Sequence, residues 1–145
     1  HCHTMLSDGR NSLEEMVPAG FAPVVDAPMQ SAAAVEALAE SIALLRKAGV
    51  DEHAFVDMMT NTLFAAPIYK GYAPLITKQQ YQPPGFAAPL GLKDVRLALA
   101  AGEKLKVPLP LGSLVRDKFL ALIARGGEGD DIAALGKIAA EQAGM

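Results

Sequence analysis

The stretch that decides the fold runs from Gly85 to Leu99 and reads GFAAPLGLKDVRLAL. It has the composition of an apolar helix, because Pro89 suits a first helical turn and the leucines and valine that follow share one face. A charged pair, Lys93 and Asp94, nevertheless lies among the leucines of its first turns. The pattern predicts a helix that continues to about Lys106, and the position of the charged pair needs an explanation.

The same periodicity recurs outward from this stretch. No segment alternates apolar and polar residues between turns as a half-buried strand does, so we expect an all-α fold, a compact bundle of about six helices with short Pro and Gly connections. The quoted segment is expected to form the longest helix. A helix is predicted over 31–48, where Gly49 ends it, and a second begins after a cap at Asp51. Further helices are predicted from Pro67 to Ile76, from Leu111 to Arg125, and after a cap at Asp130 or Asp131.

Residues 1–30 differ in character from the rest of the chain. They contain prolines and glycines without a sustained period, which predicts an irregular leader with one short helix near Ser12. The helical domain is therefore expected over 31–145. His1, Cys2 and His3 carry metal-binding side chains, but neighbours at a chain terminus rarely converge on one ion, and no metal site is expected.

Composition excludes several classes of function. The 145 residues suffice for one domain, and 51% of them are hydrophobic and 20% charged, as in a globular helical protein. The net charge is −3, and the 13 basic residues form no stripe that would bind nucleic acid. No run of apolar residues is long enough to span a membrane. The single cysteine favours a reducing compartment, and we expect a cytoplasmic protein.

Spacing alone identifies no catalytic residue. The sequence contains no nucleophile elbow, no zinc-protease motif, no phosphate-binding loop and no glycine-rich dinucleotide loop. His53 falls within an amphipathic helix, where a structural histidine is the simpler interpretation. Phe55, Met58, Met59 and Leu63 are expected on the inner side of that helix. The Met58–Met59 pair and Phe64 also leave open a carrier of hydrophobic ligands, although methionines at helical spacing more often fill a core.

The ordered motifs resemble a known family when they are considered together. The segment AAVEALAESIALLRKAGVD over 33–51 is followed by Phe86, by the Lys93–Asp94 pair, by VPLP over 107–110 and by a glycine-rich cap over 126–131. This order is similar to the C-terminal all-helical domain of the β-hydroxyacid dehydrogenases, which include 3-hydroxyisobutyrate dehydrogenases and glyoxylate/succinic semialdehyde reductases. The resemblance covers about Ala32 to Ala143.

The resemblance implies a role for the charged pair. In such enzymes the lysine of the pair reaches the cleft between two domains and contacts the nicotinamide cofactor, NAD or NADP, and the phenylalanine lines the same cleft. Carried over, Lys93 and Phe86 bind the cofactor, Asp94 supports the lysine, and a small carboxylate or other anion is expected beside Lys93. The alternative is a solvated Lys93, with Asp94 placed only to favour the positive end of the helix.

Two departures from the family pattern limit the expected activity. The resemblance implies a preceding Rossmann domain with a glycine-rich loop, and this sequence contains no such loop. The resemblance also implies a catalytic lysine upstream of Ala32, yet no lysine occurs before Lys47. We therefore expect a truncated dehydrogenase with no catalytic residue of its own, no cofactor held by this chain alone and no turnover. Its expected role is a substrate and dimerisation domain that forms a homodimer, in a simple or a domain-swapped form. The alternative is a stand-alone helical module for self-association or partner binding without catalysis.

Overall fold

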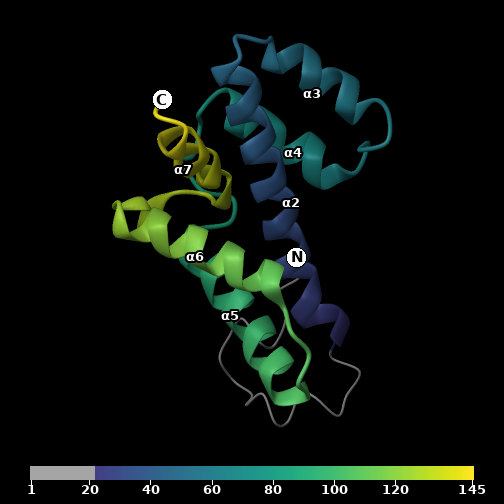
Figure 1. The fold of residues 1–145 in the computed structure, drawn as a ribbon, viewed down its shortest axis with the longest axis vertical. Coiled ribbons are helices and arrows are strands. Elements are labelled where there is room, and N and C mark those ends of the chain that lie inside the picture. Colours follow the sequence, from purple (N-terminus) through teal and green to yellow (C-terminus); the bar gives the residue numbers. More distant parts are fainter. Residues whose placement is uncertain (1–21) are drawn as a thin grey trace.

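The computed structural model describes residues 22–145, and within them the fold is all-helical (Figure 1). The short helix expected near Ser12 and the group His1, Cys2 and His3 lie outside the described residues. No strand occurs in the described part, where Ala87 and Asp131 form an isolated antiparallel bridge. The helices are α2 (Ala22–Lys47), α3 (Glu52–Thr60), α4 (Pro67–Thr77), α5 (Ala88–Leu105), α6 (Pro110–Ala124) and α7 (Leu135–Gln142), with short 3₁₀ helices η2 (Gly127–Gly129) and η3 (Ile132–Ala134).

Helix α2 corrects two predictions. It begins at Ala22 and spans 26 residues, so the irregular leader predicted over 1–30 is wrong for 22–30, and α5, with 18 residues, is not the longest helix. Pro28 lies inside α2, although proline disfavours a helix interior. Tertiary packing outweighs this cost, because Met29 and Ala32 in the following turn are buried. The division into a leader and a family-like domain stays a prediction.

The remaining helix boundaries agree with the sequence analysis to within a few residues. Asp51 caps α3 as predicted, since its Oδ1 accepts a hydrogen bond of 2.9 Å from the backbone N–H of His53. Gly49, at a φ of +69°, takes the left-handed conformation that glycine tolerates best after a helix end. Pro74 lies within α4 without ending it.

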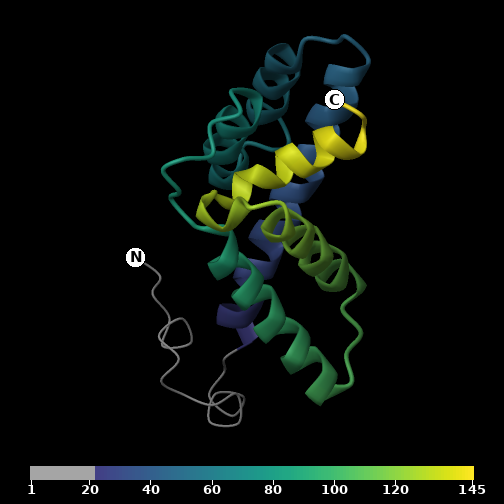
Figure 2. The same ribbon diagram turned by 90° about the vertical axis from the view of Figure 1, so that its left-hand side faces the viewer.

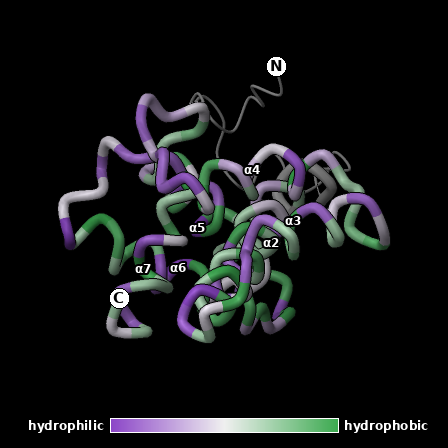
Figure 3. The backbone as a smooth tube through the Cα atoms, turned by 90° about the horizontal axis from the view of Figure 1, so that it is seen from above, coloured by the Kyte–Doolittle hydropathy of each residue, from purple (hydrophilic) through white to green (hydrophobic). Residues whose placement is uncertain are grey.

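Helix α2 is the central element of the bundle. It contacts every other α-helix, with α3 and α4 beside one half and α5 and α6 beside the other (Figure 1). Helix α7, in yellow, lies across α2 between these two pairs (Figure 2). Hydrophobic and hydrophilic stretches alternate along the helices (Figure 3). The largest fully buried side chains are Phe119, Ile42, Ile76, Leu122, Ile132, Leu135, Ile138, Val35, Val95 and Val115.

A buried ion pair joins α2 to α6. The Nζ of Lys118 lies 2.6 Å from Oε1 of Glu36, whose side chain is only 4% exposed. The same ammonium lies 3.4 Å from Glu40 and donates a 2.9 Å hydrogen bond to Gln142 at the end of α7. Burial raises the pKa of Glu36, and the nearby positive charge of Lys118 offsets this only in part. Lys118 therefore links α2, α6 and α7, and the burial of the Glu36 carboxylate in this contact is electrostatically unfavourable.

The described helices give no sign of a transmembrane segment, because none of them is both long and apolar enough to cross a bilayer.

Candidate functional site

The turn that leads into α5 is fastened by a buried carboxylate. Oδ2 of Asp131 accepts hydrogen bonds from the backbone N–H groups of Gly85, at 2.8 Å, and Phe86, at 2.9 Å. Its Oδ1 accepts a 2.9 Å bond from the N–H of Ala133 at the start of η3. Asp131 is only 2% exposed, so the carboxylate that accepts all three bonds is largely shielded from water. One side chain thus connects the turn before α5 to the turn before α7.

Backbone hydrogen bonds reinforce this connection. The N–H of Ile132 donates to the carbonyl of Phe86 at 3.0 Å, and the N–H of Ala88 donates to the carbonyl of Asp130 at 2.8 Å. The N–H of Asp131 donates to the carbonyl of Tyr81 at 2.9 Å. Phe86, the residue expected to line a cofactor cleft, is therefore held on both its N–H and its C=O, with a half-buried ring.

The sequence predicted only part of the role of Asp131. It was expected as one of two candidate caps before the last helix, and it does cap η3, which leads into α7. Its bonds to Gly85 and Phe86 bridge more than forty positions of sequence. Sequence patterns within short segments do not reveal a contact between residues so far apart in the chain.

Gly91 determines how closely α5 approaches the core. A Cβ added at Gly91 would lie 2.8 Å from Cζ of Phe119 and 2.9 Å from Cγ2 of Ile132. Both neighbours are buried, so only glycine allows the first turn of α5 to lie against α6 and η3 at this distance. The close approach sets the position of the next turn, which carries the charged pair.

Lys93 and Asp94 lie at the border of the buried face of α5. Both are half-buried, between the buried residues Leu92 and Val95 and the exposed Arg96. Their position explains the charges in an otherwise apolar segment, because the two side chains lie on the flank of the helix and not on the face that Leu92 and Val95 bury. The structure thus places Phe86, Lys93 and Asp94 within the turn before α5 and its first two turns.

Burial shifts two titratable groups at and near the start of α5. Burial raises the pKa of the Asp94 carboxyl, and the positive charge of Lys93 acts in the opposite direction. Burial, and after it the negative charge of Asp131, raises the pKa of Tyr72 to about 12. A lysine ammonium near a carboxylate, on a half-buried residue, has the chemistry to hold an anionic or polar ligand.

Metal-ligating residues do not gather in the described part of the chain. No group of three or more His, Cys, Asp or Glu side chains there is arranged to hold an ion. His53 is exposed in the first turn of α3. The described residues thus give no geometry for metal chemistry.

We expect Lys93→Met to leave the fold almost as stable as before. The side chain is only half-buried, and ion pairs near the surface contribute about 0–1 kcal/mol. Thermal unfolding followed by circular dichroism should show a melting temperature within a few degrees of the parent. A much larger loss would show that the ammonium is paired inside the core and does not serve a ligand.

The described part of the chain is a helical domain in which α5 carries the charged pair in its first two turns. A family model described as NAD-binding of NADP-dependent 3-hydroxyisobutyrate dehydrogenase matches residues 27–139. The chain therefore belongs to the family of 3-hydroxyisobutyrate dehydrogenase-like proteins, as its C-terminal helical domain. This confirms the resemblance drawn from the sequence and its all-α fold class.

Curated relatives agree with this assignment. The chain is 38% identical over 101 residues to the uncharacterized oxidoreductase YfjR of Bacillus subtilis, and this match covers 70% of this chain and 35% of the relative. It is 31% identical over 85 residues to glyoxylate/succinic semialdehyde reductase 1 of Arabidopsis thaliana, covering 59% of this chain and 29% of the relative. The chain thus spans about a third of the length of the curated relatives that it matches.

Solved structures share the fold. A 3-hydroxyisobutyrate dehydrogenase from Salmonella typhimurium superposes with a TM-score of 0.76 at 24% identity, over 83% of this chain and 42% of that one. A 3-hydroxyisobutyrate dehydrogenase from Mycobacterium tuberculosis, solved with L-serine, gives a TM-score of 0.72 at 26% identity, over 83% of this chain and 43% of that one. The helical arrangement described above therefore recurs in experimentally determined dehydrogenases.

Proposed function

We propose that this chain is the substrate and dimerisation domain of an NAD(P)-dependent β-hydroxyacid dehydrogenase, and that it does not catalyse the reaction by itself. One observation carries the proposal: Phe86, Lys93 and Asp94 lie together at the start of α5, within the segment that matches the dehydrogenase family. Two relatives are named for small carboxylates: glyoxylate/succinic semialdehyde reductase 1 for an oxo acid and a semialdehyde, and L-threonate dehydrogenase of Cupriavidus necator, 31% identical over 104 residues, for a hydroxy acid. We therefore assign a substrate of the same class, a small molecule with a carboxylate.

Each residue then has a defined task. The ammonium of Lys93 binds an oxygen of the cofactor or of an anionic substrate, and Asp94 orients that ammonium. The ring of Phe86 forms an apolar wall, and Asp131 holds the backbone on which that ring is carried. The nicotinamide, when bound, supplies or accepts the hydride. These residues bind and orient, and none of them is proposed as the proton donor.

The test of this function is the rate of NADPH oxidation by the purified 145-residue chain with glyoxylate and succinic semialdehyde, and the rate of NADP+ reduction with 3-hydroxyisobutyrate. We expect no turnover, because hydride transfer needs a positioned nicotinamide and a proton donor. A steady rate that survives repurification and scales with protein concentration would contradict the proposal.

The dimerisation role predicts a homodimer, in a simple or a domain-swapped form. Support comes from the uncovered apolar side chains of the described surface, among them Leu44 at 70% exposed and Leu111 at 52% exposed. Light scattering coupled to size exclusion should give about twice the chain mass of 15.2 kDa at micromolar concentration. A monomer mass at that concentration would reject the dimer.

A further inference from the structure

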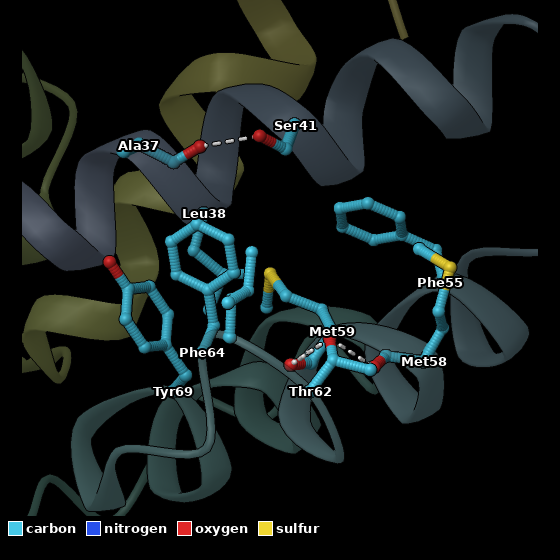
Figure 4. Close-up of a pocket in the computed structure, with 10 residues that line it drawn as sticks. Ala37, Leu38, Ser41, Phe55, Met58, Met59, Thr62, Phe64 and Tyr69 are labelled. Carbon is cyan, nitrogen blue, oxygen red and sulfur yellow. Dashed lines mark hydrogen bonds between the residues drawn. The ribbon is translucent and has the colours of Figure 1, made fainter.

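A concave site lies between α2 and the α3–α4 hairpin, on residues that the proposed cofactor role does not use (Figure 4). It has a volume of about 470 Å³, within the range of small-molecule pockets. The described residues that line it are Ala37, Leu38 and Ser41 from α2, Phe55, Met58 and Met59 from α3, and Thr62, Leu63, Phe64 and Tyr69 from the hairpin turn and α4.

Two lining residues contradict the sequence analysis. Met58 and Leu63 were expected on the inner side of their helix, but they are 59% and 93% exposed. Helix α3 ends at Thr60, so Leu63 lies in the turn beyond it and no longer follows the helical face. Met59 alone of the methionine pair is buried. The pair therefore does not simply fill a core, and Met58 remains at the rim of the pocket.

The wall of the pocket is rich in aromatic rings. The rings of Phe64 and Tyr69 pack edge to face, with centroids 5.4 Å apart and an interplanar angle of 80°. Phe55 and Met59 face the same space from α3 (Figure 4). Methionine is flexible and polarizable, so it adapts to the shape of an apolar ligand and contacts aromatic rings favourably.

The polar groups of the pocket restrict the ligand further. The Oγ of Ser41 donates its hydrogen bond to the carbonyl of Ala37 at 2.8 Å. The Oγ1 of Thr62 donates to the carbonyl of Met58 at 2.9 Å and lies 3.3 Å from that of Met59. Both hydroxyl protons are thus engaged by the backbone. None of the described lining residues is charged, so the pocket offers no counter-ion to an acidic or basic ligand.

We propose that this pocket binds a neutral, largely apolar small molecule, such as a compound with one or two aromatic rings. Its volume accommodates a ligand of that size, its wall is aromatic and thioether, and its hydroxyls retain only acceptor capacity. A dinucleotide or a small carboxylate would lack a charged partner here, which separates this pocket from the region around Lys93. The proposal is independent of the cofactor role, since no residue is shared.

The test is a fluorescence titration of the full chain with Nile red, a neutral apolar dye. We expect saturable binding of one dye per chain. Ala37→Phe should weaken it by about tenfold or more, because Ala37 is exposed on α2 and a ring there fills the pocket without disturbing the core. The matched control is Ala100→Phe, at an exposed position of α5 away from the pocket, and it should leave the affinity unchanged.

Three outcomes would overturn the proposal. The first is unsaturable binding of Nile red, and the second is equal binding by Ala37→Phe and the parent. The third is a dimer, seen by light scattering, that Ala37→Phe converts to a monomer, because the groove would then be filled by a second copy of the chain. Thermal unfolding of both variants shows whether each is folded. If Ala37→Phe does not fold, a second variant that fills the pocket, Ser41→Phe, takes its place in the Nile red titration.

Discussion

Replacing Asp131 by alanine is expected to lower the free energy of unfolding by about 3–5 kcal/mol, because hydrogen bonds to charged groups contribute about 1.5–3 kcal/mol each and three backbone N–H groups lose their buried acceptor. Those N–H groups belong to Gly85, Phe86 and Ala133. The loss should appear in urea unfolding as a lower midpoint with a similar slope. Asp131→Asn keeps one acceptor oxygen and should lie between the parent and the alanine variant.

The neighbouring aspartate provides the matched control. Asp130 accepts a 2.7 Å hydrogen bond from Nε2 of Gln82 at an exposed position, and its bond to the N–H of Ala88 uses the backbone carbonyl, which alanine retains. Asp130→Ala should therefore cost less than about 1 kcal/mol. Equal losses at the two positions would show that the buried carboxylate does not hold the entrance to α5.

Lys118→Met is expected to destabilise the protein by about 3–5 kcal/mol at pH 7, the usual cost of removing one partner from a buried ion pair. The substitution leaves the Glu36 carboxylate buried in α2 without its cation. Arg116→Met on the same helix is the control, since Arg116 pairs with Asp117 at the surface, where both side chains are at least 38% exposed. The double variant Glu36→Leu/Lys118→Met should recover most of the loss.

The pH dependence of this variant has a definite sign. The pKa of Glu36 is raised in the folded state by burial, so the folded protein binds its proton more tightly than the unfolded chain does. The contribution of Glu36 to stability is then greatest below its usual pKa and declines as the pH rises through the raised one. Without Lys118 the pKa of Glu36 in the folded state is raised further, so the loss of stability with rising pH is larger. The difference in stability between parent and Lys118→Met should therefore shrink between pH 7 and pH 4, and a constant difference would contradict it.

The all-α fold could be predicted because its determinants are local. Period, caps and glycine stops are visible in short windows, as at Asp51 and Gly49. The sequence does not reveal the start of α2, because prolines such as Pro28 are typical of an irregular segment, whereas burial of the following turn, a tertiary effect, stabilises the helix. The exposure of Met58 could not be predicted either, because apolar residues on one face of a helix are buried only where another element covers that face.

The candidate site was predicted only in part. Phe86, Lys93 and Asp94 lie in one short segment, so their order in the sequence is enough to find them. The residues that fix the geometry of the segment, Asp131 and Gly91, act through contacts with parts of the chain far away in sequence. Their roles follow from tertiary packing, which one sequence without a structure does not show.

The central claim is that the start of α5 contacts the nicotinamide cofactor through Lys93, and amide chemical shifts during an NADPH titration test it most directly. The chain alone is not expected to hold the cofactor firmly, so the contact is residual: with the isotope-labelled full chain and millimolar NADPH, we predict weak, saturable shifts confined to the amides of about 85–97. They should be lost in Lys93→Met and retained in Lys137→Met, a control at an exposed lysine of α7. Shifts that map elsewhere, no shifts at all, or an equal response in Lys93→Met would contradict the account.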